Sequence, residues 1–223
     1  MNRRVSGLIL VAALSLCTAA GVAAQQQATE PDLARLAEGK GLHVFNRSVS
    51  GVSDGARKGL RLSAQPGDGI AYVEGVEFAN GTIEFDVRGK DVLQQSFVGI
   101  AFHGVDGITF DAIYFRPFNF RTADPVRRVH AVQYISSPLY DWQKLRAEHP
   151  GVYEQAVNPV PDPNGWFHAR VVVAGSTVSV FVGDATEPSL VVKALNERTK
   201  GLVGLWVGNN SGGDFATLSI RRE

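Results

Sequence analysis

The segment Trp166–Gly183, with the sequence WFHARVVVAGSTVSVFVG, decides the fold class of this chain. Apolar and polar residues alternate in both of its halves, and a period of two is the pattern of a half-buried β-strand. The halves are separated by Gly175-Ser176, and a two-residue loop of this kind is typical of a β-hairpin. The segment therefore predicts two antiparallel strands, at 166–174 and 177–183.

The same pattern recurs in short segments along the chain, separated by clusters of Gly, Asn, Asp and Pro. Further strands are predicted at Leu42–Asn46, Gly59–Ala64, Ile70–Val73, Val76–Phe78, Thr82–Arg88, Ser96–His103, Ile108–Arg116, Val129–Ile135, Leu202–Gly208 and Phe215–Arg221. Short helices are expected only within Glu30–Gly39 and at Tyr140–Glu148, the latter inside the long insertion Pro138–Pro163. Because crossover helices are missing, a parallel sheet is excluded. The sequence predicts an all-β fold, an antiparallel β-sandwich (jelly roll) of about a dozen strands with one short helix-containing insertion.

Composition and charge narrow the function classes. The 223 residues fit one globular domain with a sizeable core. The chain has 22 Lys and Arg residues against 22 Asp and Glu residues. This balance excludes the strongly basic surface that nucleic-acid binding requires, so we expect no nucleic-acid partner.

The N-terminus has the order of a secretory signal peptide: a basic start at Met1–Arg4, an apolar run at Val5–Ala20 and small residues at 21–24. A transmembrane anchor is the alternative, but the run contains Ser, Gly and Thr and no stop-transfer charges follow it. Lipidation at Cys17 is disfavoured because the bulky Leu16 precedes it. We expect a signal peptide at 1–24, a leader at 25–41 and a jelly-roll domain at 42–223. The protein would then be secreted or periplasmic, with no membrane anchor after cleavage.

Cleavage after Ala24 would also remove the single Cys, the single Met and two Arg residues. Taking 24 residues from 223 leaves 199, and 20 basic against 22 acidic residues leave a net charge of −2. The exported chain would have no sulfur, which excludes thiol catalysis, thiolate metal sites and disulfide bonds.

Large polar and aromatic side chains are concentrated in two segments, Asp111–Arg121 and His130–Glu154. Strand alternation places Tyr114 and Arg116 on one face of the first segment. If the two segments contain neighbouring strands, either Gln133 or the pair His130 and Tyr134 shares a concave surface with them. Aromatic rings beside planar polar groups suit a sugar, because C–H faces stack on the ring and hydroxyls pair with the polar groups. The predicted substrate-binding residues are Tyr114, Asn119, His130, Gln133, Tyr134, Trp142 and Arg146. The alternative is that the aromatic residues only fill the core and Arg116 fixes a loop.

Glu154 and Asp141 are the candidate acid–base residues, because glycoside cleavage generally uses two carboxyl groups. Arg116 would stabilise developing negative charge. The chain has no Glu-x-Asp-x-x-Glu triad, and Glu84 with Asp86 is interpreted as a solvent-facing stripe.

No cofactor is firmly predicted, and no metal site is assigned. His103, His130 and His168 lie on separate strands without metal-ligand spacing. The loop Asn209–Asp214 is Gly-rich and could hold a structural calcium ion near Asp214, although a plain flexible turn is the favoured interpretation.

Three segments carry a resemblance to a known fold family: EFANGTIEFDVRGK at Glu77–Lys90, SFVGIAFHG at Ser96–Gly104 and GLVGLWVGNNSGGDFATLSI at Gly201–Ile220. They resemble the concanavalin A-like lectin/glucanase jelly rolls, including laminin-G-like domains. The resemblance covers 42–222 and implies a jelly roll with a concave sheet. The strand WFHARVVVAG at Trp166–Gly175 is similar to secreted bacterial proteins near the 3-keto-disaccharide hydrolase domain group.

The sequence leaves three functions open. The first is a secreted carbohydrate-recognising jelly roll that binds a glycan on the concave sheet face. The second is a glycan-active hydrolase or lyase of the 3-keto-disaccharide hydrolase type. The third is a protein-interaction module of the laminin-G kind. One sandwich fold supports all three, so the choice depends on the site.

Overall fold

The computed structural model describes residues 28–223. The expected signal peptide, and the first three residues of the expected leader, lie outside the described residues. Among the helices that the structure describes, none is both long and apolar enough to cross a membrane.

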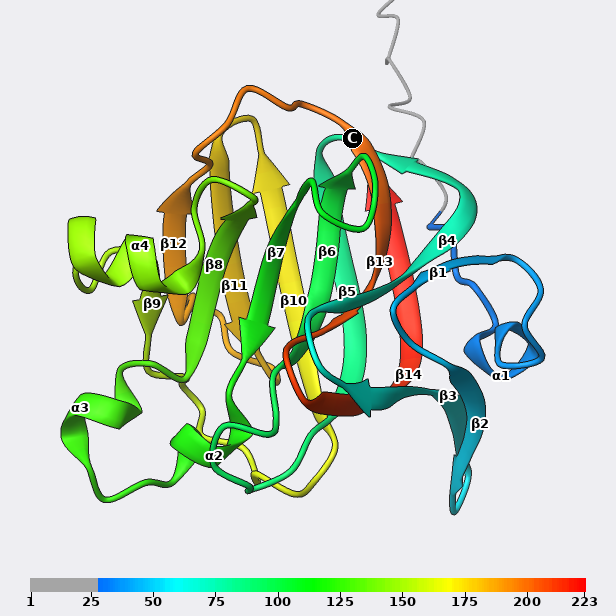
Figure 1. Ribbon diagram of the computed structural model, residues 1–223, viewed down its shortest axis with the longest axis horizontal. Helices are drawn as coiled ribbons and strands as arrows, with labels where there is room; N and C mark the ends of the chain where they lie inside the picture. The colour runs from blue at the N-terminus through cyan, green and yellow to red at the C-terminus, as the bar shows by residue number, and fades with distance from the viewer. Residues whose placement is uncertain (1–27) are drawn as a thin grey trace, which may run out of the picture.

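The described chain forms two antiparallel sheets of seven strands each, one in front of the other (Figure 1), which confirms the predicted β-sandwich. In strand order, the front sheet is β1 (Leu42–Phe45), β4 (Gly69–Phe78), β13 (Gly201–Val207), β6 (Val98–Gly104), β7 (Phe110–Phe115), β8 (Val132–Ser137) and β9 (Glu154–Gln155). The back sheet is β12 (Leu190–Lys193), β11 (Thr177–Val182), β10 (Phe167–Ala174), β5 (Gly81–Arg88), β14 (Ser211–Arg222), β3 (Arg57–Gln65) and β2 (Val49–Asp54).

The hairpin predicted from the decisive segment is formed by β10 and β11, with Ala174 opposite Thr177. Its turn residue Gly175 has a φ of 58°, a conformation that glycine adopts without steric cost. Val178, Val180 and Val182 are buried, whereas Phe181 faces outward, with the Arg170 guanidinium 3.7 Å above its ring. The alternation in the sequence therefore corresponds to one buried and one outer face.

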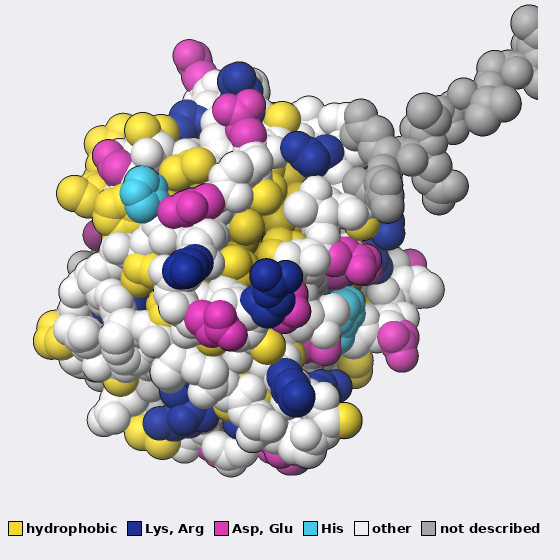
Figure 2. Space-filling model, turned by 90° about the vertical axis from the view of Figure 1, so that its right-hand side faces the viewer, with side chains coloured by type: hydrophobic (Ala, Val, Ile, Leu, Met, Phe, Trp, Pro, Cys, Tyr) yellow, Lys and Arg dark blue, Asp and Glu magenta, His cyan; other side chains and the backbone are white. Residues whose placement is uncertain are grey.

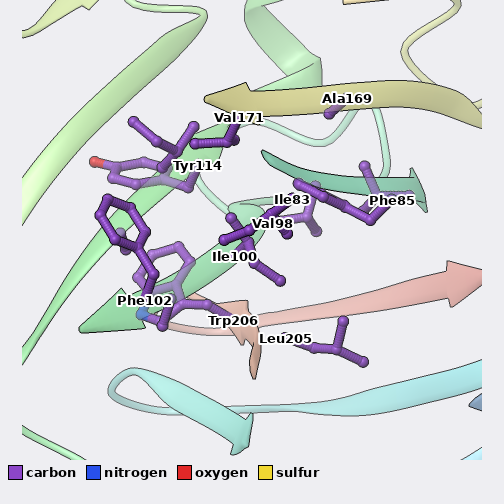
Figure 3. Close-up of a cluster of buried hydrophobic side chains, with 14 of the residues drawn as sticks. Ile83, Phe85, Val98, Ile100, Phe102, Tyr114, Ala169, Val171, Leu205 and Trp206 are labelled. Carbon is purple, nitrogen blue, oxygen red and sulfur yellow. The ribbon is translucent and has the colours of Figure 1, made fainter. Parts of the chain in front are cut away.

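The core lies between the two sheets. Aliphatic and aromatic side chains from β5 and β10 of the back sheet meet side chains from β6 and β13 of the front sheet (Figure 3). Phe115 on β7 packs edge-on against Phe167 on β10, with ring centroids 5.1 Å apart, which identifies the inner face of β7. Tyr114 is the next residue along the strand and so belongs to the outer face.

The strand boundaries needed corrections in three places. Ile70–Val73 and Val76–Phe78 are parts of one strand, β4, which continues through Gly75 at a φ of 72°. The strand predicted at Val129–Ile135 begins only at Val132, because a helix and its turn occupy the residues before it. Three strands were not predicted, namely β2, β9 and β12; they lie at sheet edges, where one side needs no partner and the apolar pattern is short.

Four short helices accompany the sheets within residues 28–223. The two predicted helices are present as α1 (Leu33–Leu36) and α4 (Trp142–Glu148), each with an Asp side chain as its N-cap. Two more, α2 (Pro117–Phe120) and α3 (Pro125–Arg128), were not predicted. Both have Pro in the first turn, and Asp124 caps α3, which is an N-terminal signal that the sequence does contain.

Acidic and basic side chains are interspersed on the side of the molecule that includes α1 and β1 (Figure 2). That side therefore has no extended field of a single sign, in agreement with the balanced composition.

Candidate functional site

The outer face of the front sheet brings together most of the predicted site residues. Tyr114 on β7 lies opposite Gln133 on β8, and Gln133 lies opposite Glu154 on β9. On the other side of Tyr114, the row continues through Gly99 to Trp206 on β13. Because paired residues of antiparallel strands share a face, these side chains form one row across the sheet. We call the group formed by Tyr114, Arg116, His130, Gln133, Arg146 and Glu154 the Arg116 cluster.

Arg116 occupies the centre of this cluster, at the end of β7. Its Nη2 donates to the Tyr114 hydroxyl at 2.7 Å and to the Gln133 Oε1 atom. Its Nη1 donates to the His130 carbonyl at 2.9 Å and lies 3.8 Å from the Glu154 Oε2 atom. The guanidinium also lies over the Tyr114 ring, 4.9 Å from its centroid. Arg116 thus ties β7, β8 and β9 together from within a nearly buried position.

Glu154 supplies the negative charge of the cluster. Arg146 from α4 donates to both of its carboxylate oxygens, at 2.9 and 2.7 Å, and the His130 Nδ1 atom lies 2.8 Å from Oε2. Burial raises the pKa of Glu154, but the hydrogen bonds and charge of Arg146, with the charges of His130 and Arg116, outweigh it and hold this pKa below its ordinary value. Glu154 is therefore ionised at neutral pH and is not a proton donor there.

Burial lowers the pKa of His130, and the positive charges of Arg146 and Arg116 act in the same direction against the attraction of Glu154. His130 is therefore neutral at pH 7. The cluster then contains two positive groups, Arg116 and Arg146, and one negative group, Glu154. The cluster therefore has one positive charge in excess, and Arg146 is its solvent-accessible positive group.

Two buried N–H donors on this face have no hydrogen-bond partner within the described residues: Gln133 Nε2 and Trp206 Nε1. Trp206 packs against Tyr114 with ring centroids 4.8 Å apart. Buried donors normally have partners, because leaving one unpaired costs about 1–3 kcal/mol. This row of side chains across the front sheet therefore has more hydrogen-bond donors than acceptors.

The part of the site that a ligand reaches lies on α4. The Trp142 side chain is 43% exposed, and the Arg146 guanidinium lies over its ring, 5.0 Å from the centroid. The Arg146 side chain is itself 34% exposed. An exposed indole is thus connected through one guanidinium to the buried Glu154 carboxylate, and α4 lies beside β8 and β9 (Figure 1).

Three predicted site residues have other positions or partners. Tyr134 does not share the outer face: it alternates with Gln133, lies opposite the inward Ile113, and donates its hydroxyl to Asp111 at 3.1 Å. Asn119 is buried, with its amide donating to the His130 carbonyl and its oxygen accepting from Arg127. Asp141 is the N-cap of α4 and accepts the Lys144 backbone N–H at 2.8 Å. The placement of Tyr134 corrects the expectation that it lines the concave surface, since both faces of β8 are buried and alternation alone did not choose between them.

Asp68, which follows the turn at Pro66-Gly67 before β4, was not among the predicted site residues. It keeps exposed surface, yet the surrounding protein raises its pKa to about 6, while Arg47 acts in the opposite direction. Its charge also raises the pKa of Tyr114, which burial and the nearby carboxylates bring to about 12 although Arg116 opposes them. Asp68 directly precedes β4, and β13 and β6 lie between β4 and the Tyr114 strand β7. The sequence showed only a turn motif at this position.

A second polar group was also missed, on the inner side at the start of β7. Asp111 is completely buried and accepts from Tyr134, from Asn196 at 2.6 Å and from Arg198 at 3.1 Å. His103 Nδ1 lies 3.4 Å from its other oxygen. These bonds attach the segment between β12 and β13 to the front sheet, so we interpret the group as structural.

Asp214 does not sit in a flexible loop. It lies within β14, and its carboxylate accepts from Arg61 and Arg88. Among residues 28–223, no group of three or more His, Cys, Asp or Glu side chains is arranged to hold a metal ion. A calcium ion near Asp214 would have to compete with two guanidinium groups for the same oxygens.

No protein-family model matches this sequence, and no curated protein matches it. Solved structures do match. Carbohydrate-binding module CBM66 from Bacillus subtilis has a TM-score of 0.57 at 14% identity, over 81% of this chain and 95% of that chain. A Bacillus subtilis protein of unknown function with a galectin-like fold has a TM-score of 0.56 at 13% identity, over 87% and 96%. The lumenal domain of VIP36, bound to Ca²⁺ and Man3GlcNAc, has a TM-score of 0.51 at 9% identity, over 82% and 84%.

These likenesses, at 9–14% identity, are likenesses of fold. The chain has the concanavalin A-like lectin/glucanase jelly-roll fold, as its segments 77–90, 96–104 and 201–220 predicted. The fold does not by itself choose among the functions that it supports.

Proposed function

We propose that this protein is a secreted or periplasmic carbohydrate-binding jelly roll, which binds a glycan on the outer, concave face of the front sheet. The observation that carries the proposal is the exposed Trp142 ring with the Arg146 guanidinium above it. A sugar would stack its C–H face on the free part of the indole and accept hydrogen bonds from Arg146. The buried Glu154 holds Arg146 in place, so the donor is preorganised.

The fold neighbours support this proposal. One is described as a carbohydrate-binding module, and another was solved with a mannose-containing glycan. Neither shares enough sequence with this chain for its binding residues to be transferred.

The test compares Trp142→Ala with Leu139→Ala, because both remove an exposed apolar side chain from the same insertion. Retention on immobilised glycans, chosen from a glycan array, should weaken at least about tenfold for Trp142→Ala, which corresponds to about 1.4 kcal/mol. Leu139→Ala should bind like the unmodified chain. Equal retention of both variants would contradict the proposal, and circular dichroism checks that both are folded.

A glycan-active hydrolase or lyase remains the alternative, and the carboxyl groups on this face argue against it. Burial raises the pKa of Asp68 to about 6, whereas the pKa of Glu154 is held below its ordinary value by Arg146. Five strand-to-strand steps separate the β4 end of the row from Glu154, a distance along the sheet of about 24 Å at the usual spacing. Glycosidase carboxyl pairs are about 5–10 Å apart. Incubation of the protein with 3-keto and ordinary disaccharides distinguishes the two functions. Release of product would favour the enzyme, whereas glycan retention without product favours the binding protein.

A further inference from the structure

A second polar site lies on the back sheet, away from the proposed glycan surface. A hollow of about 170 Å³ opens where β3, β14 and the end of β5 meet. Its lining includes Arg61, Arg88, Lys90 and Asp214, together with residues 62–64 and the glycines 89, 212 and 213. We call it the β3–β14 hollow. It has enough room for an oxyanion with some of its water.

The charged groups of the hollow do not balance. Arg61 and Arg88 both bond to Asp214, and Arg88 also bonds to Asp54 at 2.6 Å. Three positive groups, including Lys90, therefore face two carboxylates. Lys90 is exposed and makes no ion pair within the described part of the chain. At least one positive charge is left without a protein partner.

Arg61, which lines the hollow, has one guanidinium nitrogen that bonds to no other described residue. Arg61 uses Nε and Nη2 on Asp214, which leaves Nη1 unused, and more than half of its side chain is exposed. The ladder between β3 and β14 is irregular here: Ser211 pairs with Gln65 and Gly213 with Leu62, so Gly212 and the two residues opposite it fall out of register. Such bulges leave a residue unpaired. The glycines themselves are required by close packing, since a Cβ atom on Gly212 would lie 2.8 Å from the Leu62 carbonyl oxygen.

We propose that the β3–β14 hollow binds a negatively charged oxygen group, a carboxylate, sulfate or phosphate, through Arg61 and Lys90. Arg88 is held by Asp54, Asp214 and the Trp166 ring, 4.8 Å from its guanidinium carbon, and so forms the fixed wall of the site. Guanidinium and ammonium groups make their shortest and strongest hydrogen bonds to such oxyanions. The proposal does not depend on the glycan surface, because it uses the opposite sheet.

The experiment titrates the chain with sulfate, with inorganic phosphate and with glucuronate, at an ionic strength held constant with chloride. The amide signals of Lys90, Gly212 and Gly213 are followed by NMR. Lys90→Ala and Arg61→Ala should each weaken the apparent affinity at least about fivefold, the loss of one charge-assisted hydrogen bond. The matched control is Lys193→Ala, which removes a lysine from β12 at the far edge of the same sheet and should bind within about twofold of the unmodified chain.

The three probes separate the sources of the anion. If glucuronate binds most tightly, the natural anion is an acidic sugar. If sulfate binds most tightly, it is a sulfated glycan, and if phosphate does, it is a free phosphate group. Binding of any of them with the variant pattern above supports the proposal. Shifts equal to those produced by chloride alone, or variants that all bind like Lys193→Ala, would overturn it. Trp142→Ala should leave these titrations unchanged, so failure here is distinct from failure of the glycan proposal.

Discussion

At the scale of single residues, the charge of Glu154 holds the Arg116 cluster together. It is the one carboxylate that Arg116, His130 and Arg146 all approach. An arginine is never deprotonated in practice, so removal of Glu154 leaves the buried Arg116 guanidinium without its counter-charge. The cluster therefore stabilises the fold as well as orienting Arg146, and its two roles are measured separately.

Glu154→Gln is expected to lower the free energy of unfolding by about 3 kcal/mol at pH 7, the usual cost of breaking a buried ion pair. Because the pKa of Glu154 is below its ordinary value of 4.5 in the folded chain, this stabilisation is present above that pH and is lost as the pH falls through the folded pKa. Urea unfolding at pH 7 and pH 3 should show the difference between the two chains shrinking at pH 3.

The control for that measurement is Glu148→Gln. Glu148 pairs with Lys144 on the surface of α4, where both side chains are more than 40% exposed. Such a pair contributes only about 0.5 kcal/mol, so the control should unfold almost like the unmodified chain. A loss for Glu154→Gln no larger than this would show that the cluster has no stabilising ion pair.

At the scale of elements, the helix α4 positions the two solvent-accessible site residues, Trp142 and Arg146. Asp141 in turn caps the N-terminus of α4. Asp141 accepts the backbone N–H of Lys144, whereas the acid–base hypothesis gives its carboxylate a chemical role. Asn is as good an N-cap as Asp, but it has no carboxyl group. The pair of substitutions therefore separates the two interpretations.

Asp141→Ala should cost about 1 kcal/mol in unfolding free energy and weaken glycan retention, because the frayed first turn contains Trp142. Asp141→Asn should keep both properties within error. Release of product from 3-keto or ordinary disaccharides by the unmodified chain, lost in Asp141→Asn with stability and retention intact, would instead support the acid–base role. Asp124→Ala, which removes the corresponding cap of α3, is the control for stability alone.

Elements also show how far the sequence could predict the site. Period-two alternation and turn residues located β7 and β8, because the local pattern is strong in these strands. They predicted that either Gln133 or Tyr134 shares a face with Tyr114, and the structure pairs Tyr114 with Gln133. The alternation did not exclude Tyr134, because each face of β8 has both apolar and polar residues and both faces are buried. Nor did it find the pairing of Arg146 with Glu154, because β9 has two residues and the intervening loop follows no period. Asp68 was missed for a related reason: only the tertiary fold surrounds its carboxyl group with protein.

At the scale of the whole molecule, the described residues before β1 pack against the back sheet. Thr29 exchanges two backbone hydrogen bonds with Ile220 on β14, at 2.9 Å each. Leu33 of α1 is buried at 3% exposure and belongs to the main hydrophobic core. The first described residues thus extend the back sheet and cover apolar side chains at its edge. Whether the domain needs these residues, or begins at residue 42 as expected, is tested by truncation.

A chain that begins at residue 42 should be less stable than one that begins at residue 28, by about 2–4 kcal/mol from the burial of Leu33 and the two lost strand hydrogen bonds. Leu33→Ala in the longer chain should account for most of this, since truncation of a buried leucine costs about 2–5 kcal/mol. Arg35→Ala is the control, because Arg35 lies on the exposed face of the same helix. Equal urea midpoints for the two chain lengths would show that 28–41 is a leader after all. A large effect of truncation with little effect of Leu33→Ala would assign the stability to the pairing of Thr29 with Ile220.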